Sequence, residues 1–158
     1  MATAGFFGPV MTKLTGNTSG NVESLPLVTN NGGRQRVAGD QIVCAAQAAG
    51  SIISVARIPV GSMILGVRIT TSVTLATATL SVGDVNNGAA YAAAATYTAV
   101  NATASVGNAT ALMTPIASGY DSATGLVSNS YEDIVLTVGT AALPASGVIA
   151  VAVEYALD

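Results

Sequence analysis

The last third of the chain constrains the fold most, because apolar residues recur there at every second position. Residues 133–139 read DIVLTVG, and residues 148–157 read VIAVAVEYAL. A period of two places alternate side chains on one face of a β-strand, whereas a helix would need a period near 3.6. A turn-like stretch with Pro144 and Gly147 separates the two segments. The sequence therefore predicts two strands that pair antiparallel with each other.

Similar segments recur upstream, and turn-forming residues separate them at intervals of about ten residues. No long amphipathic helical pattern interrupts the series. This spacing is typical of β-sandwiches and barrels. We therefore expect an all-β fold, an antiparallel β-sandwich that is jelly-roll-like. The expected upstream strands cover residues 41–47, 51–58, 63–71, 73–82 and 109–116, and residues 89–100 are expected to form a loop that enters a strand.

Residues 1–40 differ from the rest of the chain, because neither period persists there and glycine, proline and asparagine are frequent. We expect residues 1–40 to form an extended N-terminal arm and residues 41–158 to form the sandwich domain. The two phenylalanines of the chain, Phe6 and Phe7, both lie in this arm. Aromatic anchors of this kind fit a pocket on a partner protein. The other possibility is that the arm folds back on its own domain.

Charged residues are scarce, at 8% of 158 residues, whereas typical soluble domains carry about 25%. The surface must therefore consist largely of small and uncharged polar side chains. Such a surface suits burial against copies of the chain and other proteins, although a monomer with a Thr- and Ser-rich surface is the alternative.

A net charge of −3 does not favour nucleic acid binding, which needs clustered Lys and Arg. Arg34 and Arg36 form the one close basic pair, and we assign this pair, with Phe6 and Phe7, to partner binding.

The residue types needed for catalysis are largely missing. The chain has no histidine, which removes the commonest general base and the usual metal ligand. Glu132 and Asp133 are adjacent, so in a strand they point to opposite faces and do not form an acid/base pair. We expect them at a solvated strand entrance. Neither an enzymatic activity nor a cofactor or metal is predicted.

Two further features have plain structural interpretations. Cys44 lies in the apolar run IVCAA, which predicts a buried core thiol. The segment 84–88 (DVNNG) begins like a calcium loop, but residues 89–120 contain no acidic residue to complete it, so a turn is expected.

Arg57 and Arg68 interrupt apolar strand patterns. Facing solvent, they would protect strand edges from aggregation. Facing a partner, they would pair with carboxylates across an interface. Both readings stay open.

No membrane segment or signal peptide is expected. The N-terminus lacks a basic stretch before an apolar one. Polar residues and glycines interrupt the uncharged range 85–120, which is unlike a membrane-spanning helix.

Four segments resemble a known family: residues 58–68 (IPVGSMILGVR), 78–84 (ATLSVGD), 133–139 (DIVLTVG) and 155–158 (YALD). They are similar to the head decoration, or cement, proteins of tailed bacteriophages, over about residues 55–158. The resemblance implies a β-sandwich or jelly roll on the outside of the virion, made in the host cytoplasm. It implies two partners, the major capsid protein, whose subunits it would bridge, and further copies of itself in a dimer or trimer. The arm lies outside the resemblance.

A carbohydrate- or receptor-binding module of a fibre or adhesin is the alternative. Sugar sites commonly stack an exposed aromatic ring on the sugar. The chain has no tryptophan, and its five tyrosines show no tight cluster in the sequence.

Overall fold

The computed structural model describes residues 34–107 and 111–157. Within these ranges every regular element is a β-strand. The strands are β1 (Arg34–Val43), β2 (Ile52–Pro59), β3 (Met63–Thr71), β4 (Thr79–Gly83), β5 (Ala92–Thr96), β6 (Thr103–Val106), β7 (Gly119–Tyr120), β8 (Val127–Ser128), β9 (Tyr131–Gly139) and β10 (Val148–Leu157). The described residues include no helix long and apolar enough to cross a membrane.

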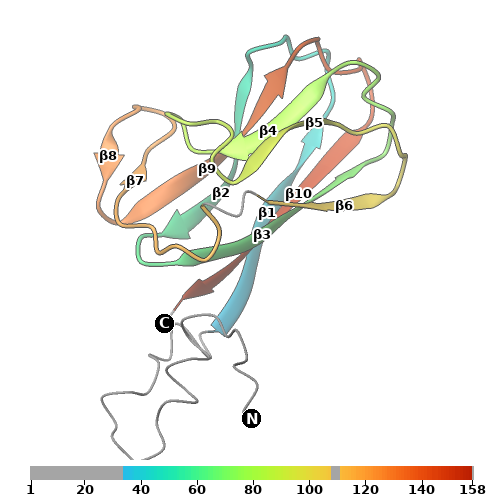
Figure 1. The fold of residues 1–158 in the computed structure, drawn as a ribbon. Coiled ribbons are helices and arrows are strands. Elements are labelled where there is room, and N and C mark those ends of the chain that lie inside the picture. Colours follow the sequence, from blue (N-terminus) through green and yellow to red (C-terminus); the bar gives the residue numbers. More distant parts are fainter. Residues whose placement is uncertain (1–33, 108–110, 158) are drawn as a thin grey trace, which may run out of the picture. The chain divides into compact units, whose positions relative to one another are not determined.

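Eight of these strands form two four-stranded sheets, with the orders β1-β10-β3-β6 and β2-β9-β4-β5 (Figure 1). The apolar faces of both sheets contribute to one hydrophobic core, which includes Ile69 and Val153 from the first sheet and Ile134 and Leu136 from the second. All four side chains are fully buried. The predicted all-β, antiparallel, jelly-roll-like sandwich is thus confirmed.

The predicted pairing between the last two strands is wrong. β9 pairs with β2 and β4, whereas β10 pairs with β3, so the two strands belong to different sheets. The connection 140–147 crosses from one sheet to the other. Each strand buries one apolar face, and the crossing places these faces on opposite sides of the same core.

Two other predicted strands are corrected. Residues 73–78 are not a strand, because Ala76 has a φ of 53° and the Ala78 amide donates to the Leu75 carbonyl in a turn. Residues 111–116 form turns, and Pro115 makes one isolated bridge, to Met63. Local alternation predicted strands at both places, but left-handed backbone at Ala76 and at Met113, whose φ is 62°, breaks the extended conformation.

The first strand starts earlier than expected. β1 begins at Arg34, so the range 34–40, which the sequence analysis assigned to the arm, is sheet. Residues 1–33 lie outside the described residues. The predicted turn at 84–88 is present, with the Asp84 carboxylate accepting from the amides of Asn86 and Asn87 at 2.7 and 2.8 Å. Cys44 is buried as predicted, and burial raises the pKa of its thiol.

The expectation of a solvated Asp133 is wrong. Its carboxylate is 2% exposed and accepts from Arg57 Nε at 2.6 Å and from the Ser122 amide and hydroxyl at 2.9 Å. The hydrogen bonds from Arg57 are the main reason why the pKa of Asp133 falls to about 2. The Arg57 guanidinium also lies over the Tyr131 ring, 3.8 Å from its centre. These contacts fasten the β7–β8 segment to the outer face of β9.

Glu132 is also buried, on the opposite face of β9. The Tyr91 hydroxyl donates to its carboxylate at 2.8 Å. Burial raises the pKa of Glu132 and, together with the nearby Glu132 charge, raises the pKa of Tyr91 as well. Both carboxylates therefore anchor parts of the chain that are far apart in sequence.

Candidate functional site

The two sheets differ in whether loops of the chain cover their outer faces. On the sheet β2-β9-β4-β5, Val135 points away from the core cluster and is nevertheless fully buried. Loops cover it on this side. Ser122 contacts Asp133, and a Cβ built on Gly88 would lie 2.5 Å from the Thr137 hydroxyl oxygen. The outer face of the sheet β1-β10-β3-β6 carries no such layer among the described residues.

We call this second outer face the open face. The strand registers place its side chains in rows that run across the sheet, for example Ala152 beside Arg68 and Arg68 beside Ser105. Most of its members are small or uncharged. The open face comprises Gln35, Val37, Arg68, Thr70, Thr103, Ser105, Ala150, Ala152 and Glu154.

One ion pair lies at the middle of the open face. The Arg68 guanidinium donates to Glu154, and the Gln35 amide donates to the same carboxylate at 3.3 Å. The side chain of Arg68 is 49% exposed and that of Glu154 is 21% exposed. Arg68 therefore pairs with a carboxylate of its own sheet while part of its guanidinium stays accessible.

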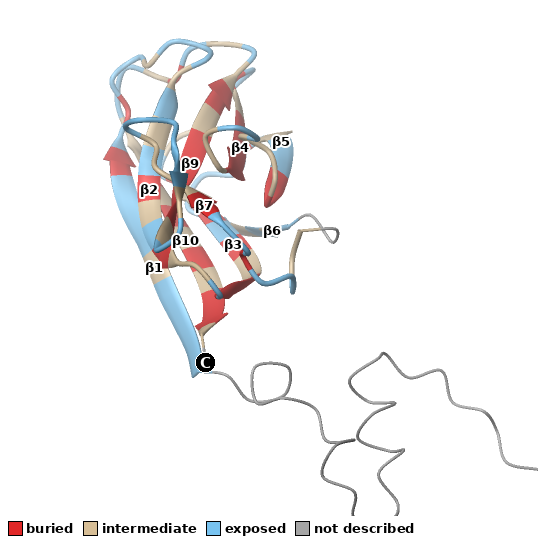
Figure 2. Ribbon diagram, turned by 90° about the vertical axis from the view of Figure 1, so that its left-hand side faces the viewer, coloured by how far each residue is buried: buried red, intermediate tan, exposed pale blue. Residues whose placement is uncertain are grey.

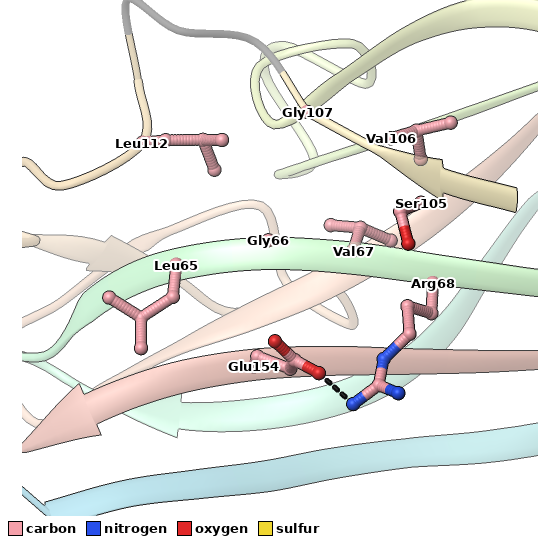
Figure 3. A pocket seen from close by; sticks show the side chains of 9 residues that line it. All are labelled: Leu65, Gly66, Val67, Arg68, Ser105, Val106, Gly107, Leu112 and Glu154. Carbon is pink, nitrogen blue, oxygen red and sulfur yellow. Dashed lines mark hydrogen bonds and ion pairs between the residues drawn. The ribbon is translucent and has the colours of Figure 1, made fainter.

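Two shallow hollows flank Arg68. The first, of about 570 Å³, is lined by apolar groups of Leu65, Val106 and Leu112 next to the Arg68–Glu154 pair (Figure 3). The second, of about 640 Å³, lies on the other side of Arg68, along Val37, Thr70 and Ala150. A face of small side chains lets the backbone of another protein approach closely. A single charged pair between two hollows can fix the orientation in which that protein binds.

The described residues that the sequence analysis assigned to partner binding do not belong to the Arg68–Glu154 pair or its flanking hollows. Arg34 and Arg36 are the first and third residues of β1 and are exposed. By strand alternation they point to the face opposite Gln35. Phe6 and Phe7 lie outside the described residues. The structure brings Arg36 into the sheet but does not join it to the ion pair.

The Arg68–Glu154 pair was missed by sequence reasoning. Both residues interrupt apolar strands, and that signal was noticed for Arg68 but not for Glu154. Pairing the two required the β3–β10 register, in which Ala152 lies opposite Arg68 and Glu154 opposite Gly66. Arg57 likewise pairs within its own sheet, with Asp133.

The tyrosines offer little surface for stacking against a sugar. Tyr91, Tyr97 and Tyr155 are buried. Tyr120 and Tyr131 are half-buried, and Arg57 lies over the Tyr131 ring. The described residues contain no group of three His, Cys, Asp or Glu that could hold a metal ion.

Two solved structures contain chains with a similar fold. A chain in a structure described as the cyanophage Pam1 capsid asymmetric unit is similar with a TM-score of 0.62 and 24% identity, over 81% of this chain and 88% of that one. A chain in the capsid of Ralstonia phage GP4 is similar with a TM-score of 0.59 and 17% identity, over 80% of this chain and 86% of that one.

No protein-family model matches the sequence. No curated protein matches it either.

Proposed function

We propose that this chain is a structural protein of a phage virion, which binds the outside of the capsid and bridges or stabilises subunits of the major capsid protein. The observation that carries the proposal is the open face: a sheet of small side chains with one ion pair, on a sandwich whose other outer face the chain covers itself. The fold shared with chains from two phage capsid structures supports the setting. The low charge of the surface supports burial against protein.

Binding to capsids tests the proposal directly. The full chain is mixed with capsids of the phage that encodes it, prepared without this protein, and bound chain is measured by co-sedimentation. We expect saturable binding and a higher temperature of capsid disruption, because a ligand of the assembled shell stabilises that state. Capsids that neither bind the chain nor change in stability would contradict the proposal.

Two matched variants test the open face. Ala152→Glu places a charge in the middle of this face, and Ala123→Glu places the same charge on an exposed residue of the β7–β8 segment. We expect Ala152→Glu to weaken capsid binding at least about tenfold, because a second carboxylate beside the Arg68–Glu154 pair leaves this face with a net negative charge that would be buried in the contact. Ala123→Glu should bind like the unmodified chain. Equal binding by both variants would exclude the open face as the contact.

We also propose that Phe6 and Phe7 anchor the N-terminal segment in a pocket of the capsid protein. The double variant Phe6→Ala/Phe7→Ala should then lose affinity for capsids while the sandwich unfolds at the same temperature. Limited proteolysis adds a second readout, since the segment should be cut more slowly on particles than in the free protein. Equal resistance in both states would refute the anchor.

A further inference from the structure

β1 presents a long strand edge. It is the terminal strand in the order β1-β10-β3-β6, and no described strand pairs with its other side. It has ten residues, whereas β6, the opposite edge, has four. β2, an edge of the other sheet, carries a bulge near Ser54 and ends at Pro59, and both features discourage pairing. β1 has no proline, and most of its length is exposed (Figure 2).

The charges of this edge are arranged symmetrically. Arg36 and Asp40 lie two residues before and two residues after Ala38. Both are exposed, and neither forms an ion pair within the part of the chain that the structure describes. Along a strand, positions separated by two residues share a face, so both charged side chains lie on the same face as Ala38.

This arrangement is self-complementary. When two copies of β1 pair antiparallel about Ala38, Arg36 lies opposite the partner's Asp40, and Asp40 lies opposite the partner's Arg36. Opposite charges directly across an antiparallel pair stabilise it, whereas like charges destabilise it. Val37 then lies opposite the partner's Gly39, which leaves room for the valine side chain.

We propose that β1 is the interface for a second copy of this chain, in a two-fold symmetric dimer whose sheets join through β1 centred on Ala38. Such a contact uses the same patch on both copies, so it closes after two. The joined sheet would contain eight strands, and the open faces of both copies would lie on the same side of it. The proposal concerns the free protein and stands apart from capsid binding.

One other register also matches charges. Pairing centred on Val37 would place Arg34 opposite the partner's Asp40, but it would pair only residues 34–40 of β1, whereas the register centred on Ala38 pairs residues 34–42. Because the Ala38 register pairs more of the strand, we favour it. In the Ala38 register a charge reversal at Arg36 should weaken the dimer more than one at Arg34, and in the Val37 register the order should be reversed.

Charge reversal tests the interface. The full chain is studied without capsids by analytical ultracentrifugation, and we expect a monomer–dimer equilibrium. Arg36→Asp should raise the dimer dissociation constant at least about tenfold, since two acidic pairs replace two ion pairs. The double variant Arg36→Asp/Asp40→Arg should restore the dimer. Arg34→Asp, the matched control with the same charge change, should have the smaller effect.

Cysteine cross-linking tests the register. Residues directly opposite in an antiparallel pair have Cα atoms about 4.5–5.5 Å apart, which a disulfide can bridge. Ala38→Cys should form a covalent dimer under mild oxidation, because it faces its own counterpart. Val43→Cys, at the exposed end of the same strand, should not, since its counterpart would be roughly 30 Å away. Unmodified protein gives the background from the buried Cys44.

Three results would overturn the proposal: a chain that stays monomeric at millimolar concentration, a trimer, or a dimer that neither Arg36→Asp weakens nor Ala38→Cys cross-links. Circular dichroism and thermal unfolding of each variant separate a lost interface from a lost fold. Failure of the capsid-binding experiments would leave these outcomes unchanged, because no capsid is present.

Discussion

Glu132 and Asp133 show how strongly the surroundings of a residue decide its chemistry. They are neighbours in β9, and both are buried. Asp133 accepts charge-assisted hydrogen bonds from Arg57, which lower its pKa to about 2. Burial raises the pKa of Glu132, although the Tyr91 hydroxyl donates to its carboxylate and acts in the opposite direction. The sequence places both at a strand entrance but says nothing of these partners, because the partners lie far away along the chain.

Asp133 should stabilise the fold above pH 4 and lose this effect in acid. Its folded pKa of about 2 lies below the unfolded value of about 3.9. The ionised form therefore favours folding by roughly 2 kcal/mol at neutral pH, and the gain fades as the pH falls from about 4 to about 2. Urea unfolding of the unmodified chain and of Asp133→Asn should show a gap in unfolding free energy at pH 7 that nearly closes at pH 2. A gap independent of pH would contradict this assignment.

The contribution of Glu132 to stability should depend on pH in the opposite way to that of Asp133. Its raised pKa means that the folded state binds a proton more tightly than the unfolded state, so protonation favours folding as the pH falls. Tyr91→Phe removes the single hydroxyl donor and should cost about 1–3 kcal/mol at pH 7, because the buried carboxylate is left without a partner. Glu132→Gln keeps an acceptor and removes the charge, so its cost should be clearly smaller. Thermal unfolding of both variants at pH 7 checks the order.

At the scale of elements, the sequence located most strands but not their partners. The predicted strand at 63–71 and the one at 148–157 coincide with β3 and β10. Buried and less buried residues alternate over most of β10, whereas β3 departs from alternation at Met63 and Ile64. The predicted β9–β10 pairing was wrong. Adjacency in the sequence suggested a hairpin, but the two strands bury their apolar faces against the same core from opposite sheets, so the chain crosses between the sheets. The strand predicted at 73–82 begins only at Thr79, because the backbone at Ala76 is left-handed, which alternation does not reveal.

The turn after β4 should tolerate no side chain at Gly83. A Cβ there would overlap the Asn87 carbonyl oxygen and would lie 2.7 Å from the Ala90 amide nitrogen. Gly83→Ala should therefore cost more than about 2 kcal/mol, a size typical of overpacking. Gly66→Ala is the matched control, because a Cβ there meets nothing within 4 Å. Similar melting temperatures for the two variants would show that the turn shifts freely.

At the scale of the whole molecule, the sandwich has one covered and one open outer face. Val135 and Ala152 both point away from the core by strand alternation, yet Val135 is fully buried and Ala152 is partly exposed. The difference comes from the loops that lie against the second sheet: Ser122 donates to Asp133, and Gly88 lies close to Thr137. The face left open is the one that we assign to the capsid protein.

Paired substitutions measure this difference. Val135→Thr keeps the volume and buries a hydroxyl without a partner, so it should lower the unfolding free energy by about 1–3 kcal/mol. Ala152→Ser adds a hydroxyl on the open face and should change the unfolding free energy by less than about 0.5 kcal/mol. Equal effects in urea unfolding would mean that the loops do not seal the face over Val135.

The sequence by itself determined that the chain is an all-β protein, where most strands lie, and that Cys44 is buried, because a period of two is a local property of extended backbone. Only the tertiary structure decided which strands pair, which outer face stays open, and that Arg57 and Arg68 find their carboxylates at Asp133 and Glu154. Alternation distinguishes the two faces of a strand but not one partner strand from another. That choice depends on contacts between residues far apart in the chain, which form only when both sheets close over one core.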